Sequence, residues 1–214
     1  MGKIFNLDSP VVQAVGKVGQ MMITTLTWLI FCLPIVTVGA ATVAMCRIMI
    51  NLKEDKSCAF KEFFRAFKEN FKKATLLWLI LLACVAVLTA LFYLVVLVES
   101  SILRMIALMV FCLLFFLVYI AAVYMFPLTA YFENTVANTV CNAIGMGLAN
   151  LRQSIFSIAL TLLPLVLMLI SMQLFLTMLF LLVILGPGAI CYGIVCILLP
   201  VFERYSPANE ELAF

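Results

Sequence analysis

Residues 57–75 read SCAFKEFFRAFKENFKKAT and form the one long charged stretch of a very apolar chain. The phenylalanines in it recur at the spacing of a single helix face, which predicts an α-helix. They are Phe60, Phe63, Phe64, Phe67 and Phe71. An apolar stripe opposite a mainly basic face is typical of a helix that lies in a membrane interface. We therefore predict an interfacial helix over residues 57–73 that leads directly into a membrane span.

The composition of the whole chain indicates its class. Of its 214 residues, 67% are hydrophobic and 11% are charged, and the mean hydropathy is +1.27. A soluble domain carries about 25% charged residues. The apolar residues form long continuous runs instead of the short alternating segments of a β-barrel. We predict an all-α polytopic membrane protein, a single integral membrane domain over residues 1–214, with five to six transmembrane helices and two cytoplasmic interfacial amphipathic helices.

Residues 18–50 follow a predicted amphipathic helix over residues 1–17 and permit two topologies. Pro34 disfavours helical geometry around it, so the stretch is either one kinked span or a hairpin of two short helices. The positive-inside tendency favours the hairpin, because the amino-terminal lysines then stay with the other basic residues. The length argues against it, because a full span needs about 17–25 residues. We expect the hairpin, with Thr37 capping a second helix whose small residues, such as Gly39, allow close packing.

Four further apolar runs predict membrane spans. They cover residues 74–98, 105–130, 154–172 and 174–202, and a polar tail follows over residues 203–214. The motif Gly186-Pro187-Gly188 interrupts the last run. It is either an unwound segment lining a binding site, as in transporters, or a simple loop between two shorter helices. We favour the loop.

A second amphipathic helix is predicted in the Asn-rich stretch of residues 131–154, where apolar residues again keep helical spacing. A shift of eighty residues aligns it with the Phe-striped helix, so that Asn70-Phe71-Lys72-Lys73 falls on Asn150-Leu151-Arg152-Gln153. Each unit would then consist of a span, an interfacial helix and a span, repeated in parallel. Chance similarity between two amphipathic helices is the competing explanation.

Seven of the thirteen Lys and Arg residues lie between Lys53 and Lys73, beside the predicted membrane. Nucleic acid is a poor partner for this cluster, because the cluster is short and carries four acidic residues. Membrane lipids with anionic headgroups are a simpler partner. The positive charge predicts that this face, together with the second amphipathic helix and the C-terminus, is cytoplasmic. The residues that we select for docking a protein partner are Phe63, Arg65, Phe67, Lys68, Asn70, Phe71 and Lys72.

Arg47 is the only basic residue well inside an apolar run. A charge within the membrane is by default a functional-site hypothesis, with Glu133 or the open carbonyls near Pro34 as candidate partners. Alternatively, Arg47 lies near the cytoplasmic end of its helix and extends to the lipid headgroups. The nearby Asn51 and Lys53 favour this second interpretation.

Four asparagines recur partly at helical spacing in the second amphipathic stretch. They are Asn134, Asn138, Asn142 and Asn150. They would line one side of a polar groove, although a solvated helix face explains the pattern equally well.

Residues that carry enzymatic chemistry are scarce. The chain has no histidine, the commonest general base and metal ligand, and no Gly-x-x-x-x-Gly-Lys-Ser/Thr phosphate loop. None of its ten acidic residues lies in the middle of a predicted span, where a proton-driven pump usually carries one. The eight cysteines are scattered without a C-x-x-C pair, as expected of reduced core residues. We expect no catalytic residue, and no resident cofactor or metal.

Four segments occur along the chain in a characteristic order. They are FNLDSP (Phe5–Pro10), LPIVTVGAA (Leu33–Ala41), FFRAFKENFKKAT (Phe63–Thr75) and FERYSP (Phe202–Pro207). Together they resemble the YesL-like family of bacterial integral membrane proteins, a domain of unknown function. The resemblance implies a multi-pass protein of the bacterial cell membrane. It also implies gene neighbours that are sugar-binding lipoproteins, carbohydrate ABC importer permeases and glycan-degrading enzymes, notably for pectin-type polysaccharides. No catalytic or ligand residue carries over.

We therefore expect a non-enzymatic accessory membrane protein that works with a carbohydrate (oligosaccharide) ABC uptake system. Its partners would be importer permease or ATPase subunits. One alternative is a permease-like transporter subunit, because an interfacial helix between two spans is also how a permease could contact an ATPase. Another is a membrane scaffold or regulator unrelated to sugar uptake. The oligomeric state stays open.

Overall fold

The computed structural model describes residues 10–56, 60–170 and 172–205, and these residues are almost entirely helical. The elements are α1 (Pro10–Phe31), the 3-10 turn η1 (Ile35–Thr37), α2 (Val38–Lys53), α3 (Phe60–Val96), α4 (Ser101–Tyr131), α5 (Val136–Ala149), α6 (Leu151–Ile170), α7 (Met172–Ile184) and α8 (Gly186–Arg204). The helices long and apolar enough to cross a membrane are α3, α4, α6, α8 and the stretch Ile35–Lys53. The predicted all-α polytopic membrane fold is confirmed.

Helices α1 and α2 form an antiparallel hairpin that closes at residues 32–37. At its open end the Lys17 ammonium lies 2.7 Å from the Asp55 carboxylate. Nearer the turn, the Trp28 indole donates a hydrogen bond of 3.2 Å to the Thr42 hydroxyl. Helix α1 continues through residue 17, where the prediction placed a boundary, because no proline separates the amphipathic start from the apolar part and the helix tolerates Gly16 and Gly19. Residues 1–9 lie outside the described residues.

The turn between α1 and α2 is held by Thr37, in a role that differs from the predicted one. Thr37 directly precedes α2, but its hydroxyl makes no hydrogen bond to the amides of that helix. It bonds instead to the carbonyl oxygens of Phe31 and Pro34, over 2.5 and 2.7 Å. The side chain therefore satisfies the Phe31 carbonyl that the end of α1 leaves open, and it reinforces the turn at Pro34, whose carbonyl also accepts from the Thr37 amide.

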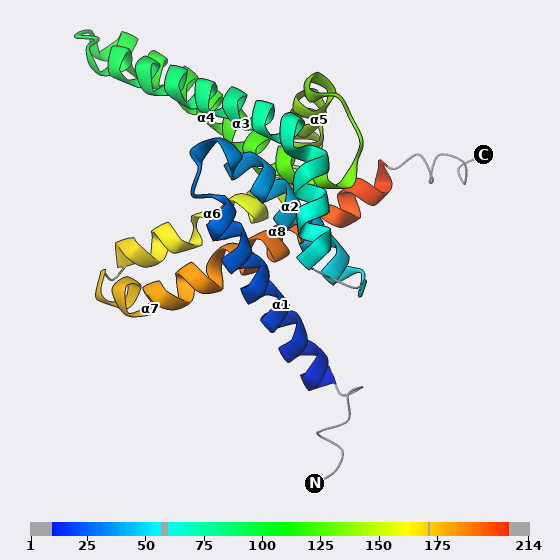
Figure 1. Ribbon diagram of the computed structural model, residues 1–214. Helices are drawn as coiled ribbons and strands as arrows, with labels where there is room; N and C mark the ends of the chain where they lie inside the picture. The colour runs from blue at the N-terminus through cyan, green and yellow to red at the C-terminus, as the bar shows by residue number, and fades with distance from the viewer. Residues whose placement is uncertain (1–9, 57–59, 171, 206–214) are drawn as a thin grey trace.

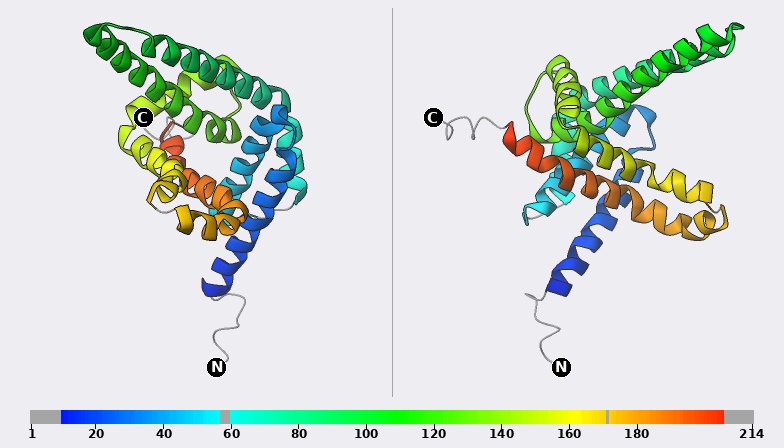
Figure 2. Two further views of the ribbon diagram at one scale, coloured as in Figure 1. Left: turned by 90° about the vertical axis from the view of Figure 1, so that its left-hand side faces the viewer. Right: turned by 180° about the vertical axis from the view of Figure 1, so that it is seen from behind.

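Helix α3 joins the predicted interfacial helix and the following span without a break between residues 73 and 74. Its 37 residues extend for about 55 Å, which exceeds the roughly 30 Å of bilayer hydrocarbon. The charged first half must therefore lie outside the hydrocarbon. Figures 1 and 2 show that α3 changes direction along its length, so the two halves run at an angle.

The first half of α3 packs antiparallel along α2. At one end the Asn51 amide donates a hydrogen bond of 3.1 Å to the Glu62 carboxylate. At the other end the backbones approach so closely that a Cβ on Gly39 would collide with the Ala74 carbonyl and the Trp78 side chain. The predicted close approach at the small residues of α2 is thus confirmed.

Helix α5 follows a short loop after α4 and corresponds to the second predicted amphipathic helix. The Thr135 hydroxyl accepts a hydrogen bond from the Asn138 amide and so caps its first turn. Gly147 lies against Ile120 of α4, and the Tyr124 hydroxyl lies 2.9 Å from that of Ser154. These contacts attach α5 and the start of α6 firmly to the buried end of α4.

The two halves of the proposed repeat share one local feature and differ in another. The side-chain amides of Asn70 and Asn150 donate to the carbonyl one helical turn earlier, over 3.1 and 3.0 Å. However, α3 runs straight through Asn70, whereas Asn150 separates α5 from α6. The parallel repeat stays a prediction.

The last predicted span consists of two helices separated by a single residue, Leu185. Its amide bonds to Leu181 and its carbonyl accepts from Ala189, so helical hydrogen bonding passes across the junction. Pro187 stands in the first turn of α8, where its missing amide costs no hydrogen bond. The two shorter helices that we predicted are present, but the loop between them is not, because Leu185 alone separates α7 from α8 and the Gly-Pro-Gly motif lies in the first turn of α8.

The hairpins α3–α4 and α6–α7 project to one side of the molecule and diverge, whereas α5 and the end of α8 lie on the opposite side (Figures 1 and 2). Large apolar side chains are exposed along both hairpins, as expected for surfaces in contact with lipid. Helix α2 lies in the centre, with most of its side chains fully buried. The polar residues gather at the end of the molecule away from the hairpin tips.

Candidate functional site

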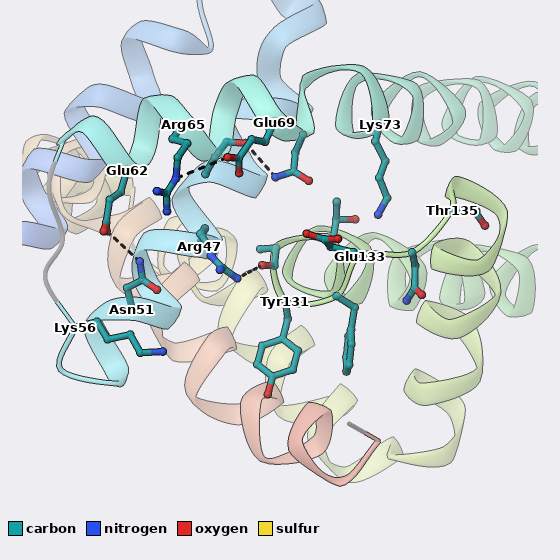
Figure 3. A pocket seen from close by; sticks show the side chains of 16 residues that line it. Arg47, Asn51, Lys56, Glu62, Arg65, Glu69, Lys73, Tyr131, Glu133 and Thr135 are labelled. Atoms are coloured by element: carbon teal, nitrogen blue, oxygen red, sulfur yellow. Dashed lines mark hydrogen bonds and ion pairs between the residues drawn. The ribbon is translucent and has the colours of Figure 1, made fainter. Parts of the chain in front are cut away.

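A large polar cavity lies between α2, the first half of α3 and the loop from α4 to α5, and has a volume of about 780 Å³ (Figure 3). We call it the polar pocket. Its charged lining residues are Arg47, Lys56, Glu62, Arg65, Glu69, Lys73 and Glu133. Asparagine, threonine and alanine residues complete the wall together with the aromatic residues Tyr131 and Phe132. Such a pocket can bind a ligand through hydrogen bonds from several directions.

Arg47 projects from α2 into the polar pocket and is exposed there. Its Nη1 donates a hydrogen bond of 2.8 Å to the carbonyl oxygen of Ala130. That carbonyl belongs to the last turn of α4, which has no intrahelical partner for it. The structure thus gives Arg47 a partner other than Glu133 or the carbonyls near Pro34, because an open carbonyl at the end of α4 lies within hydrogen-bond distance of it.

Two further contacts order the α3 wall of the pocket. The Arg65 guanidinium lies 3.7 Å from the Glu69 carboxylate one turn later. The Asn70 amide is held by the Ala66 carbonyl at 3.1 Å. Together with the bond from Asn51 to Glu62, these contacts fix the polar side chains on the side of α3 that faces the pocket.

Lys73 and Glu133 differ from the other charged residues of the pocket. Their side-chain ends face each other in Figure 3, yet within the described part of the chain no hydrogen bond or close ion pair joins them. Partial burial lowers the pKa of the Lys73 ammonium, and the attraction of the Glu133 carboxylate acts in the opposite direction. Both groups keep their hydrogen-bonding capacity for a ligand.

The structure divides the residues selected for docking into two groups. Phe63 is only 2% exposed, and Phe67, Asn70 and Phe71 are half-buried. The Phe31 ring packs against the rings of Phe63 and Phe67 at centroid distances of 5.7 and 5.0 Å. Most of the phenylalanine stripe thus faces the protein interior, so these side chains are not free for a partner.

The remaining selected residues, Arg65, Lys68 and Lys72, are exposed. With the exposed Lys61 they recur at intervals of three or four residues and form one side of α3, which we call the basic stripe. Only Arg65 in this stripe has a close carboxylate partner among the described residues. The basic stripe is therefore the part of the predicted docking surface that is open to a partner.

The predicted asparagine groove does not form as one surface. Asn134 lines the polar pocket, whereas Asn138 and Asn142 are exposed elsewhere on α5. Asn150 is engaged with the Met146 carbonyl. Sequence reasoning named Glu133 only as a candidate partner of Arg47 and counted Lys73 only in the basic cluster, so it did not predict that these two residues face each other in one pocket.

A second cavity of about 370 Å³ is apolar and lies where the two hairpins diverge. Trp28, Tyr119, Phe126 and Pro187 are among its lining residues. Cys46 and Cys191 also line it, with their sulfur atoms 3.5 Å apart. Over the residues that the structure describes, no three His, Cys, Asp or Glu side chains come together as a metal site would require.

A comparison with known protein families finds a match for the part of the chain that runs from α1 into α3. Residues 21–92 match the model of a family described as "Protein of unknown function, DUF624". This part of the chain is similar to that family. The match agrees with the resemblance to the YesL-like membrane proteins. The matched segment runs from α1 through most of α3, and it includes Arg47, the basic stripe and two of the three walls of the polar pocket. No curated protein and no solved structure matches the chain.

Proposed function

We propose that this protein is a non-enzymatic accessory membrane protein of a bacterial carbohydrate ABC uptake system and docks an importer subunit through the basic stripe. The resemblance to the YesL-like family supplies the link to sugar uptake. The stripe would face the cytoplasm, in agreement with the positive-inside tendency. An ATPase or the cytoplasmic loops of a permease would be within its reach.

One observation carries this proposal: Lys61, Arg65, Lys68 and Lys72 form a continuous exposed row. Phe63, Phe67 and Phe71 of the same helix are buried or half-buried, whereas Phe60 and Phe64 are exposed beside the row. A partner with an acidic surface would be attracted and oriented by such a row. The helix itself is anchored along α2, which holds the row rigid and lowers the entropy cost of docking.

Affinity capture from native membranes tests the proposal. The wild-type protein should recover permease or ATPase subunits of a carbohydrate importer, and the double variant Lys68→Gln/Lys72→Gln should recover several-fold less. Arg104→Gln is the matched control, because Arg104 is an exposed cation at the start of α4, on the far hairpin. Recovery of no importer subunit by the wild type would overturn the proposal. Recovery of an unrelated partner alone would favour the scaffold or regulator alternative.

The permease-like alternative rests on the apolar cavity between the diverging hairpins. Pro187, at the junction of α7 and α8, lines this cavity, and its volume of about 370 Å³ lies within the roughly 300–1,000 Å³ of small-molecule sites. Reconstituted vesicles separate the two functions. Uptake of labelled oligosaccharide by this chain alone, or with only an ATPase added, would favour the permease. Uptake that requires a separate permease would favour the accessory role.

A further inference from the structure

We propose that the polar pocket binds a neutral, polyhydroxylated small molecule of the saccharide class. This inference rests on the proposed function for the source of its ligand, a sugar delivered by the uptake system. The chemistry of the pocket argues for the ligand class by charge, by hydrogen bonding and by size.

The charges that line the pocket nearly cancel. Four cationic side chains face three carboxylates, which leaves a net charge of one. The carboxylates would repel a multivalent anion, and the guanidinium and ammonium groups would repel a cation, so neither kind of ligand is strongly favoured. A neutral ligand avoids both penalties and can still use every charged group as a hydrogen-bond partner.

The most specific indication of the ligand class comes from Lys73 and Glu133. An ammonium group can only donate hydrogen bonds, and a carboxylate can only accept them. A hydroxyl group placed between the two accepts from Lys73 and donates to Glu133 at the same time. The two side chains face each other without a direct bond, so a ligand hydroxyl would give Lys73 an acceptor and Glu133 a donor (Figure 3).

The surrounding polar groups extend this preference to several hydroxyls. Arg47 uses one of its five donors on Ala130 and keeps the others. Asn51 and Asn70 each use a side-chain N–H within the protein, which leaves their carbonyl oxygens able to accept from a ligand. A volume of about 780 Å³ lies within the roughly 300–1,000 Å³ of small-molecule sites.

Calorimetry and thermal unfolding of the purified full-length protein in lipid nanodiscs test the proposal. The probes are glucose, rhamnose, maltose and inositol as neutral ligands, with galacturonate as an anionic and glucosamine as a cationic comparison. At least one neutral probe should bind and raise the melting temperature. Lys73→Ala and Glu133→Ala should each weaken its binding about ten-fold, as expected for a lost hydrogen bond to a charged group.

Lys61→Ala is the matched control, because Lys61 lies on the same helix, is exposed and does not line the pocket. It should leave binding within about two-fold of the wild type. Glu133 is exposed, so its variant keeps the fold and the test remains valid if Lys73→Ala is unstable. The proposal is wrong if no neutral probe binds up to about 10 mM, if galacturonate or glucosamine binds more tightly, or if the control weakens binding equally.

The two proposals can fail separately. Capture of importer subunits without any saccharide binding would leave the accessory function standing and exclude the saccharide site. Saccharide binding that depends on Lys73 and Glu133, without capture of an importer, would establish the site and remove the proposed function.

Discussion

Arg47 of α2 donates a hydrogen bond from its guanidinium to the carbonyl of Ala130 in the last turn of α4, over 2.8 Å. These residues are 83 positions apart in the chain. A cation at a helix C-terminus also interacts favourably with the helix dipole. This contact ties the centre of the molecule to the loop that closes the polar pocket.

Replacement of Arg47 by alanine should destabilise the protein by about 1 kcal/mol. The hydrogen bond to the Ala130 carbonyl and the favourable contact with the helix dipole are lost, but water can still reach the open carbonyl. A loss of this size lowers the melting temperature by roughly 2–4 °C in a chain of this length. Thermal unfolding in nanodiscs measures it. Arg47→Lys keeps the charge and should recover part of the loss, and an unchanged melting temperature for Arg47→Ala would show that the contact contributes nothing.

Gly39→Ala should destabilise the packing of α2 against α3, because the added Cβ would collide with the backbone carbonyl of Ala74, which cannot rotate away. Overpacking of this kind costs about 1–3 kcal/mol. Gly19→Ala is the matched control, since nothing lies near its Cβ position and alanine favours helix. Equal melting temperatures for the two variants would contradict the close approach of α2 and α3.

Phe63→Ala should cost about 3 kcal/mol of unfolding free energy, whereas Phe64→Ala should cost far less. The reason is burial, because Phe63 is 2% exposed and Phe64 is 44% exposed. Chemical denaturation of the two variants compares them directly. A larger loss for Phe64 would mean that the phenylalanine stripe is turned differently on α3.

Cys46 and Cys191 should cross-link when the membrane preparation is treated with copper–phenanthroline, since their sulfur atoms lie 3.5 Å apart. The expected product is an intramolecular disulfide between α2 and α8, identified by mass spectrometry of linked peptides. Cys112 is exposed on α4 and should form no intramolecular link. If Cys46 remains a free thiol under conditions that modify Cys112, the packing of α2 on α8 is not as described.

The helices could be predicted from the sequence wherever their signal lies in neighbouring residues, as hydrophobic periodicity and composition do. The spacing of the phenylalanines placed the start of α3, and Pro34 placed the turn between α1 and α2. Both signals depend on residues within one or two turns. The turn at Pro34 also brought Phe31 next to α3, and this contact determines that Phe63 and Phe67 face inward.

The candidate site could not be predicted in the same way, because its residues come from three distant parts of the chain. Lys73 and Glu133 become neighbours only after α4 has returned to the charged end of the molecule. The partner of Arg47 is a backbone carbonyl, and a sequence carries no mark of which carbonyl stays open. The basic stripe was partly predicted, because the positive charge of this segment is visible in the sequence. Which side chains of the helix are exposed and which phenylalanines are buried became clear only from the packing of the helices.

Site-specific photocross-linking in native membranes tests the central claim that the basic stripe docks an importer subunit. Benzoyl-phenylalanine is placed at position 68, in the stripe, or at position 104 as the control on the far hairpin. Irradiation should link position 68, and not position 104, to a permease or ATPase subunit of a carbohydrate importer. Cross-links from position 68 to lipid alone, or equal protein cross-linking from both positions, would contradict it.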